Sequence, residues 1–161
     1  MAVDMFLKVD GIEGESMDDT HLNEIDVLAW SWGLSQSGTM HIGGGGGAGK
    51  VNVQDISITK YFDKASAPLM QACMSGLHIP EVSLVVRKSG GEQLEYIIIK
   101  FTEVLVSSLS TGGSGGEDRL TENLSLNFAK VETIYKPQSG DGTVGADVTS
   151  GWDIQANKTL V

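Results

Sequence analysis

The chain has 161 residues, an apolar fraction of 40% and a formal net charge of −10. This length and composition are those of one folded domain over residues 1–161 rather than a disordered chain. The negative charge is not offset by any cluster of lysine or arginine, so it repels phosphate groups and excludes nucleic acid as a partner. Since no apolar run approaches the roughly 18 residues of a membrane span, we expect no membrane insertion.

The beginning of the chain does not resemble a secretion signal. Asp4 lies among its first residues, and no apolar run there is long enough for the core of a signal peptide. Cys73 is the single cysteine, so neither a disulfide within the chain nor a CxxC metal pattern can form. We therefore expect folding in a reducing cytoplasm and, for export, a route other than the general secretory pathway.

Apolar and polar residues alternate with a period of two along most of the chain, which predicts β-strands. The predicted strands cover residues 3–9, 25–34, 51–58, 81–88, 94–109, 120–128 and 151–159. In the third of these the alternation slips at Gln54 and Asp55, which indicates a bulge or a sharp bend. Glycine-rich stretches and a turn at 89–92 separate the strands.

One helix is predicted between Ser66 and Gly76. Ser66 is a favourable N-cap residue, Pro68 is tolerated in the first turn, and Gly76 favours termination. Its apolar stripe, which includes Cys73, is expected to pack inward. Seven or eight strands and one helix predict a mainly β fold: a closed or nearly closed antiparallel β-barrel, or a sandwich, with one flanking helix and long glycine-rich loops.

The strand over 120–128 has two faces of different character. Leu124 and Leu126 belong to an apolar face that is expected to lie in the core. The opposite face is polar and uncharged, and it carries Thr121, Asn123, Ser125 and Asn127. On a single barrel this face is an ordinary solvated surface. In a ring of copies it could line a water-filled bore.

Two short motifs resemble reactive sites but lack the residues that the chemistry requires. Residues 44–50 read G-x-x-x-x-G-K, yet Val51 stands where a phosphate-binding loop has Ser or Thr, and a strand pattern follows instead of a helix. Residues 112–116 read G-x-S-x-G around Ser114, but neither a helix nor a histidine follows. We therefore predict no nucleotide, no other cofactor and no catalytic residue.

The three histidines also give no site. His21, His41 and His78 lie far apart in the sequence and on different predicted elements. His21 stands near Asp18 and Asp19, but such a grouping in a turn is usually only solvated. We predict no metal ligand.

Eight segments that follow one another along nearly the whole chain match the pattern of a known family. They are GIEGES (11–16), EIDVLAWSWG (24–33), DISITK (55–60), DKAS (63–66), RKSGG (87–91), VLVSS (104–108), LNFAKV (126–131) and GWDI (151–154). Because so many segments occur in one order, the match is specific. The chain resembles the haemolysin-coregulated protein family of type VI secretion systems.

The resemblance implies a structural protein and not an enzyme, with no cofactor. It implies a barrel that assembles into a homohexameric ring, with rings stacked into a tube. In the family a contractile sheath drives the tube, tipped by a spike protein of the valine–glycine repeat type, and small effector proteins occupy the bore. Synthesis in the bacterial cytoplasm and secretion through the type VI system, to the extracellular space or a target cell, are implied as well.

Two sets of residues are candidate assembly sites. The family stacks its rings through an extended hairpin, for which the matching stretch is 36–50. The candidate stacking residues are His41, Gly43, Gly44, Gly45, Gly46, Gly47 and Lys50. The loop over 110–117 and the polar strand face are candidates for the bore or its rim. The candidate bore residues are Ser114, Thr121, Asn123, Ser125 and Asn127.

Two alternatives stay open from the sequence. One is a monomeric barrel that carries a ligand or acts as a chaperone. The other is a small hydrolase that uses Ser114.

Overall fold

The computed structural model describes residues 2–44, 47, 49–140 and 144–161. Its elements are, in chain order, β1 (Val3–Val9), β2 (Ile25–Ser31), β3 (Leu34–Ser35), β4 (Asn52–Val53), β5 (Ile56–Tyr61), α1 (Ser66–Ser75), β6 (Ile79–Lys88), β7 (Glu95–Thr111), β8 (Thr121–Tyr135), β9 (Val148–Asp153) and β10 (Lys158–Thr159). Within these ranges the one helix falls short of the length and apolar character needed to cross a membrane.

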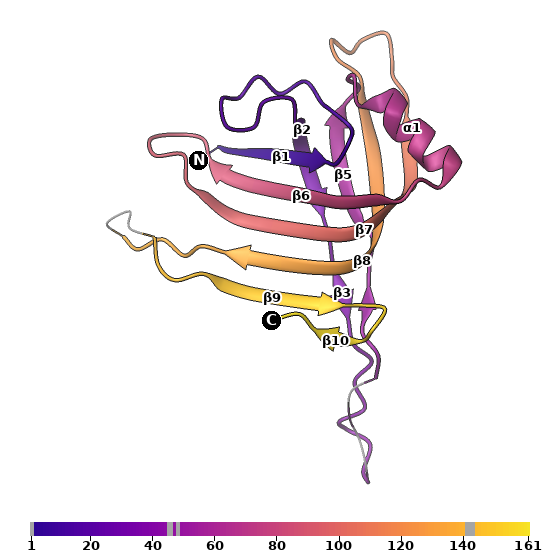
Figure 1. Cartoon of the computed structure of the whole chain (residues 1–161), viewed down its shortest axis with the longest axis vertical. Helices are drawn as coiled ribbons and strands as arrows, with labels where there is room; N and C mark the ends of the chain where they lie inside the picture. Colours follow the sequence, from indigo (N-terminus) through magenta and orange to yellow (C-terminus); the bar gives the residue numbers. More distant parts are fainter. Residues whose placement is uncertain (1, 45–46, 48, 141–143) are drawn as a thin grey trace.

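Six antiparallel strands close into a barrel in the order β8-β5-β2-β1-β6-β7, and β7 then pairs back with β8. The β7–β8 hairpin is the longest pairing, from Ile97 opposite Tyr135 to Thr111 opposite Glu122. The second half of β8 extends beyond β5 and pairs with β9, which in turn pairs with β10 (Figure 1). Closure leaves no free edge between these six strands. The predicted closed barrel with one flanking helix is confirmed.

The inward-facing side chains of the strands are apolar and fill the barrel. On β8, Leu124 and Leu126 are fully buried, while the intervening Asn123 and Asn127 are exposed. Phe101 and Phe128 pack with ring centroids 4.6 Å apart. The helix lies against β7 and buries Leu69 and Ala72. The core is therefore shared by the barrel wall and the helix.

The predicted second strand, 25–34, is wrong at its end. The strand stops at Ser31, and Leu34–Ser35 belong instead to a separate two-stranded sheet with β4. The chain bends because the Trp32 indole Nε1 donates to the Gln54 carbonyl at 2.9 Å and Gln54 N–H donates to the Gly33 carbonyl at 3.0 Å. The interruption predicted at Gln54 and Asp55 is the break between β4 and β5.

The predicted last strand, 151–159, is also wrong as a single element. β9 ends at Asp153, whose carboxylate accepts a hydrogen bond from Ala156 N–H at 2.9 Å. Asn157 then adopts a φ of 55°, so the chain reverses and β10 runs antiparallel to β9. A carboxylate that accepts from a backbone amide two or three residues later is a common turn device.

The expectation that Ser66 caps the helix is wrong. The N-cap position is Ala65, and no side chain caps the helix there. Ser66 is fully buried inside the first turn, and its hydroxyl donates to Glu122 Oε1 at 2.6 Å. Ser66 therefore ties the helix to the barrel wall instead of capping the helix.

A buried ion pair forms the centre of this contact. Lys60 on β5 lies directly opposite Glu122 on β8, and neither residue is more than 1% exposed. The Lys60 ammonium contacts Glu122 Oε1, Asp63 Oδ1 at 2.9 Å, the Tyr61 carbonyl at 2.9 Å and Ser66 Oγ at 3.2 Å. A buried charge is tolerated only when it is paired and hydrogen-bonded in this way. The cluster thus joins two wall strands to the start of α1.

Replacing Glu122 by Leu should destabilise the barrel strongly, because Asp63 is then the one counter-charge that the described residues provide for the buried Lys60 ammonium. We expect the free energy of unfolding to fall by about 3 kcal/mol or more. The double variant Lys60→Met/Glu122→Leu should recover much of this loss, since it removes both buried charges. Denaturant unfolding followed by tryptophan fluorescence measures both. A double variant that is less stable than Glu122→Leu would contradict this account.

Candidate assembly surfaces

A long hairpin projects from one end of the barrel (Figure 1). Its arms pair where they leave the barrel, with Leu34 opposite Val53. Further out, the Thr39 hydroxyl donates to the Gly47 carbonyl at 2.7 Å and accepts from Gly47 N–H at 2.9 Å. These bonds hold the arms together well beyond the short sheet, so the hairpin is a defined projection.

Most of the predicted stacking residues are exposed on this hairpin. His41, Gly43, Gly44 and Lys50 are exposed and Gly47 is half-buried, whereas Gly45 and Gly46 lie outside the described residues. Two apolar side chains that the sequence analysis did not single out accompany them: Met40 is 81% exposed and Ile42 is 55% exposed. Apolar side chains exposed on a projecting segment are typical of a contact surface.

The structure after the G-x-x-x-x-G-K motif differs from that of a phosphate-binding loop. The chain after Lys50 enters β4, a strand, and not a helix. The helix N-terminus that binds phosphate in such loops is therefore missing.

The outer face of β8 carries the predicted bore residues. Thr121, Asn123 and Asn127 are exposed and Ser125 is half-buried, on the side opposite the core. The neighbouring strand β5 fixes one of them, because the Thr59 hydroxyl donates to Asn123 Oδ1 at 2.8 Å. We call this surface of β5 and β8 the polar wall.

One carboxylate lies at the end of the polar wall. Asp55 accepts from the Ser107 hydroxyl at 2.6 Å and from Asn127 Nδ2 at 2.8 Å. These bonds join β7 and β8 to the residue that precedes β5, on the outer side of the barrel. The wall is therefore a pre-ordered surface of small hydrogen-bonding groups.

The structure brings Ser114 to the same surface. Ser114 lies in the loop between β7 and β8, where its carbonyl accepts from Glu117 N–H at 3.2 Å and closes a turn. Together with Thr121 and Asn123 it lines a shallow pocket of about 410 Å³. Three of the five predicted bore residues thus meet at one place, and Ser125 and Asn127 continue along the strand.

A second groove lies at the base of the hairpin. It has a volume of about 470 Å³ and is bordered by Trp32, Val53, Val131 and Trp152. The Trp152 indole Nε1 is buried and has no hydrogen-bond partner within the described part of the chain. Aromatic residues of this kind are enriched where proteins contact each other.

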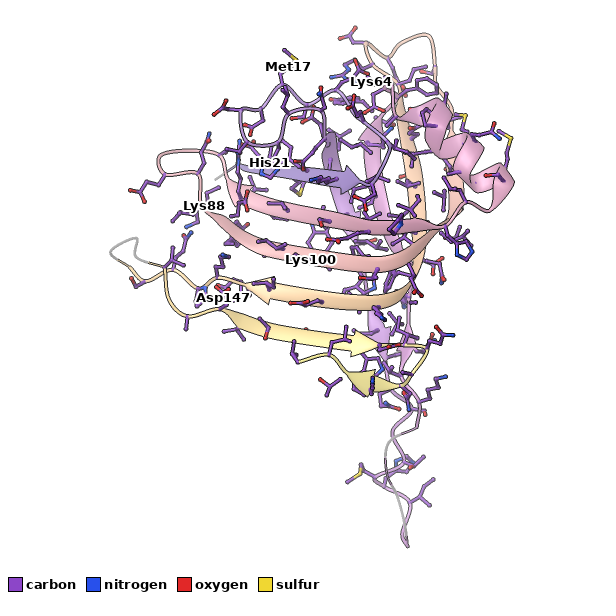
Figure 2. All side chains as sticks on the ribbon, in the orientation of Figure 1. Met17, His21, Lys64, Lys88, Lys100 and Asp147 are labelled. Atoms are coloured by element: carbon purple, nitrogen blue, oxygen red, sulfur yellow. The ribbon has the colours of Figure 1, made fainter. Side chains whose placement is uncertain are left out.

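The segment over 10–24 forms the end of the molecule opposite the hairpin, where Figure 2 labels Met17 and Lys64. Arg87 on β6 anchors this segment: it donates to the Asp18 carboxylate and, at 3.0 Å, to the Thr20 hydroxyl. The hydrogen bonds from Arg87 hold the pKa of Asp18 well below its usual range. Arg87 also lies 4.9 Å above the Phe6 ring.

His21 completes this anchor. Its ring stacks on Phe6 with centroids 4.4 Å apart, its Nδ1 contacts Glu24 at 3.0 Å, and its Nε2 contacts Glu95 at 2.7 Å. The sequence suggested Asp18 and Asp19 as neighbours, but neither is a partner of the ring. Among the residues that the structure describes, no group of His, Cys, Asp or Glu is arranged to hold a metal ion.

The comparisons with known proteins agree on one family. The family described as "Type VI secretion system effector, Hcp" matches residues 6–135. Protein hcp1 of Pseudomonas aeruginosa is 65% identical over 159 residues, which are 98% of each chain.

Two solved structures share the fold. The crystal structure of Hcp1 from Salmonella typhimurium superposes with a TM-score of 0.83 at 43% identity and covers 99% of this chain and 100% of that one. The structure of a type six secretion system protein gives a TM-score of 0.92 at 35% identity, over 98% and 99% of the two chains. The chain therefore belongs to the Hcp family, the tube proteins of type VI secretion, which are structural proteins and not enzymes.

Proposed function

We propose that six copies of this chain form a ring, that rings stack into a secreted tube, and that the bore holds and protects small effector proteins. The polar wall is the observation that carries this proposal. It is an ordered, nearly uncharged surface on the outside of a barrel whose inside is already filled by core side chains. Such a surface suits contact with water and varied cargo more than tight binding of one ligand.

A ring of identical subunits requires contacts between unlike patches of neighbouring copies. The chain offers several surfaces for them, among which the groove at the hairpin base is bordered by the side chains of Trp32 and Trp152. The hairpin continues the direction of β2 and β5 beyond the end of the barrel (Figure 1), so it is free to reach a copy outside the ring.

The wider partners follow from family membership. Hcp proteins are secreted by the type VI system, and for this chain we propose the sheath around the tube and the valine–glycine repeat spike at its tip as partners. The net charge of −10 keeps a protein of high copy number soluble during this passage.

The purified protein should have a mass about six times the 17.1 kDa of the chain, and annular particles should appear in electron micrographs. Closed rings are the expected symmetry of a homo-oligomer with repeated unlike contacts. Light scattering coupled to size exclusion measures the mass. A protein that stays monomeric even at millimolar concentration would contradict the ring and favour the monomeric carrier.

Bulky residues on the polar wall should release cargo without opening the ring. Replacing Ser114 or Thr121 by Trp removes a small hydrogen-bonding group and fills the pocket that both residues line. Such a change costs on the order of 1–3 kcal/mol of binding, so retained cargo should fall about tenfold or more.

Co-purification of an effector with the ring measures this loss, and Thr149→Trp on the exposed part of β9 is the matched control. Equal retention in Thr121→Trp and Thr149→Trp rings would contradict the placement of the polar wall in the bore.

A further inference from the structure

One cation of the protein lies at the end of the polar wall. The outward-facing residues of the wall are themselves uncharged: they are Ser57, Thr59, Tyr61, Thr121, Asn123, Ser125 and Asn127. Arg119 precedes β8, in the loop that lies at the same end of the barrel as α1 (Figure 1). Its guanidinium Cζ is 3.7 Å from the centroid of the Tyr61 ring, and Tyr61 lies directly opposite Thr121 in the β5–β8 pairing.

The Tyr61 ring fixes the orientation of this guanidinium. A cation over an aromatic face is attracted by the electrons of the ring, and a stacked guanidinium keeps its N–H groups directed sideways, where they can still donate. The ion pairs of the described residues involve the cations His21, Lys60, Lys64 and Arg87, and not Arg119. Arg119 is exposed. It is therefore an oriented donor group that is available to a partner.

The acids near Arg119 limit what kind of site it can form. Glu117 and Asp118 precede it in the chain, so the loop as a whole is not basic. Burial raises the pKa of Asp26 on the neighbouring strand β2, and the positive charge of Arg119 opposes this rise. The candidate site is therefore a single oriented guanidinium and not a general basic patch.

A pocket adjoins this guanidinium. It is the pocket of about 410 Å³ that Ser114 and Thr121 line, and Ser110 and Asn123 border it as well. Because Thr121 lies opposite Tyr61, the pocket and the cation occupy neighbouring positions on one surface. The pocket supplies small hydroxyl and amide groups, and Arg119 supplies the charge.

We propose that Arg119 binds carboxylate groups in an acidic segment of the cargo protein. A planar guanidinium with paired N–H groups matches the two oxygens of a carboxylate. The proposal rests on the proposed function, because a ring with the polar wall in its bore brings the copies of Arg119 together around the cargo. Symmetry then places one guanidinium per subunit at the same level of the bore, so one acidic segment can contact several of them.

The charge of the rest of the chain favours a protein segment over a nucleic acid as the bound anion. A protein segment can place a few carboxylates at Arg119 while its uncharged residues lie along the hydroxyl and amide groups of the wall. A nucleic acid carries a charge at every phosphate, and a chain with a net charge of −10 repels each of them.

Peptide binding to purified rings tests the role of Arg119. The probe is a rhodamine-labelled peptide of repeated Glu-Gly-Ser units, and the matched peptide has Gln in place of every Glu. At low salt, fluorescence anisotropy should show at least about tenfold tighter binding of the Glu peptide, since its carboxylates form charged hydrogen bonds. Added salt should reduce this preference.

Arg119→Gln should abolish the preference for the Glu peptide. Arg119→Lys should retain only part of it, because an ammonium group does not bind both carboxylate oxygens in the same planar way. Lys158→Gln is the matched control: it removes an equal charge from an exposed residue of β10 and should leave the preference unchanged. Light scattering should give the same ring mass for every variant.

A wild-type chain that forms no ring overturns the proposed function itself. Rings that bind both peptides equally, or a preference that is the same in Arg119→Gln and Lys158→Gln rings, overturn the role of Arg119 alone. Loss of the ring in Arg119→Gln does so too, because it places the residue in a subunit contact. Equally tight binding of a thymidine oligonucleotide with the same number of charges overturns carboxylate as the preferred ligand.

Discussion

Closure of the barrel is the constraint on which the rest of this structure depends. β8 pairs with β7 along almost its full length and with β5 along its first half, and the Lys60–Glu122 pair joins β5 to β8 from the inside. The interior is filled by core side chains. What the protein does must take place on its outer surfaces, which is consistent with a structural family.

Three outer surfaces stand out: two connections that leave the barrel and one face of the barrel itself. The hairpin connects β2 to β5, and the segment over 10–24 connects β1 to β2. The polar wall is the outward-facing surface of β5 and β8. The two insertions point in opposite directions and carry different charge (Figure 1). A subunit with two unlike ends and an ordered hydrophilic side is suited to an assembly in which copies repeat in one direction.

Period-two patterns predicted most strands, the closed barrel and the exposure of Asn123 and Asn127, because alternation directly records which side of a strand is buried. The Lys60–Glu122 pair was missed, although the signal was present: each residue occupies an inward position in an otherwise apolar register. The contact of His21 with Glu95 joins residues 74 positions apart and could not be predicted from spacing. The bend at Trp32 depends on a similar long-range bond to Gln54.

The orientation of the subunit in its assembly tests the account most directly. A cryo-electron microscopy map of the purified rings, at a resolution that traces β8, would show which face of the barrel borders the central hole. The account predicts that Asn123 and Asn127 face that hole, with the hairpin directed toward the next ring. A map with these two residues on the outer circumference, or buried between neighbouring subunits, would contradict it.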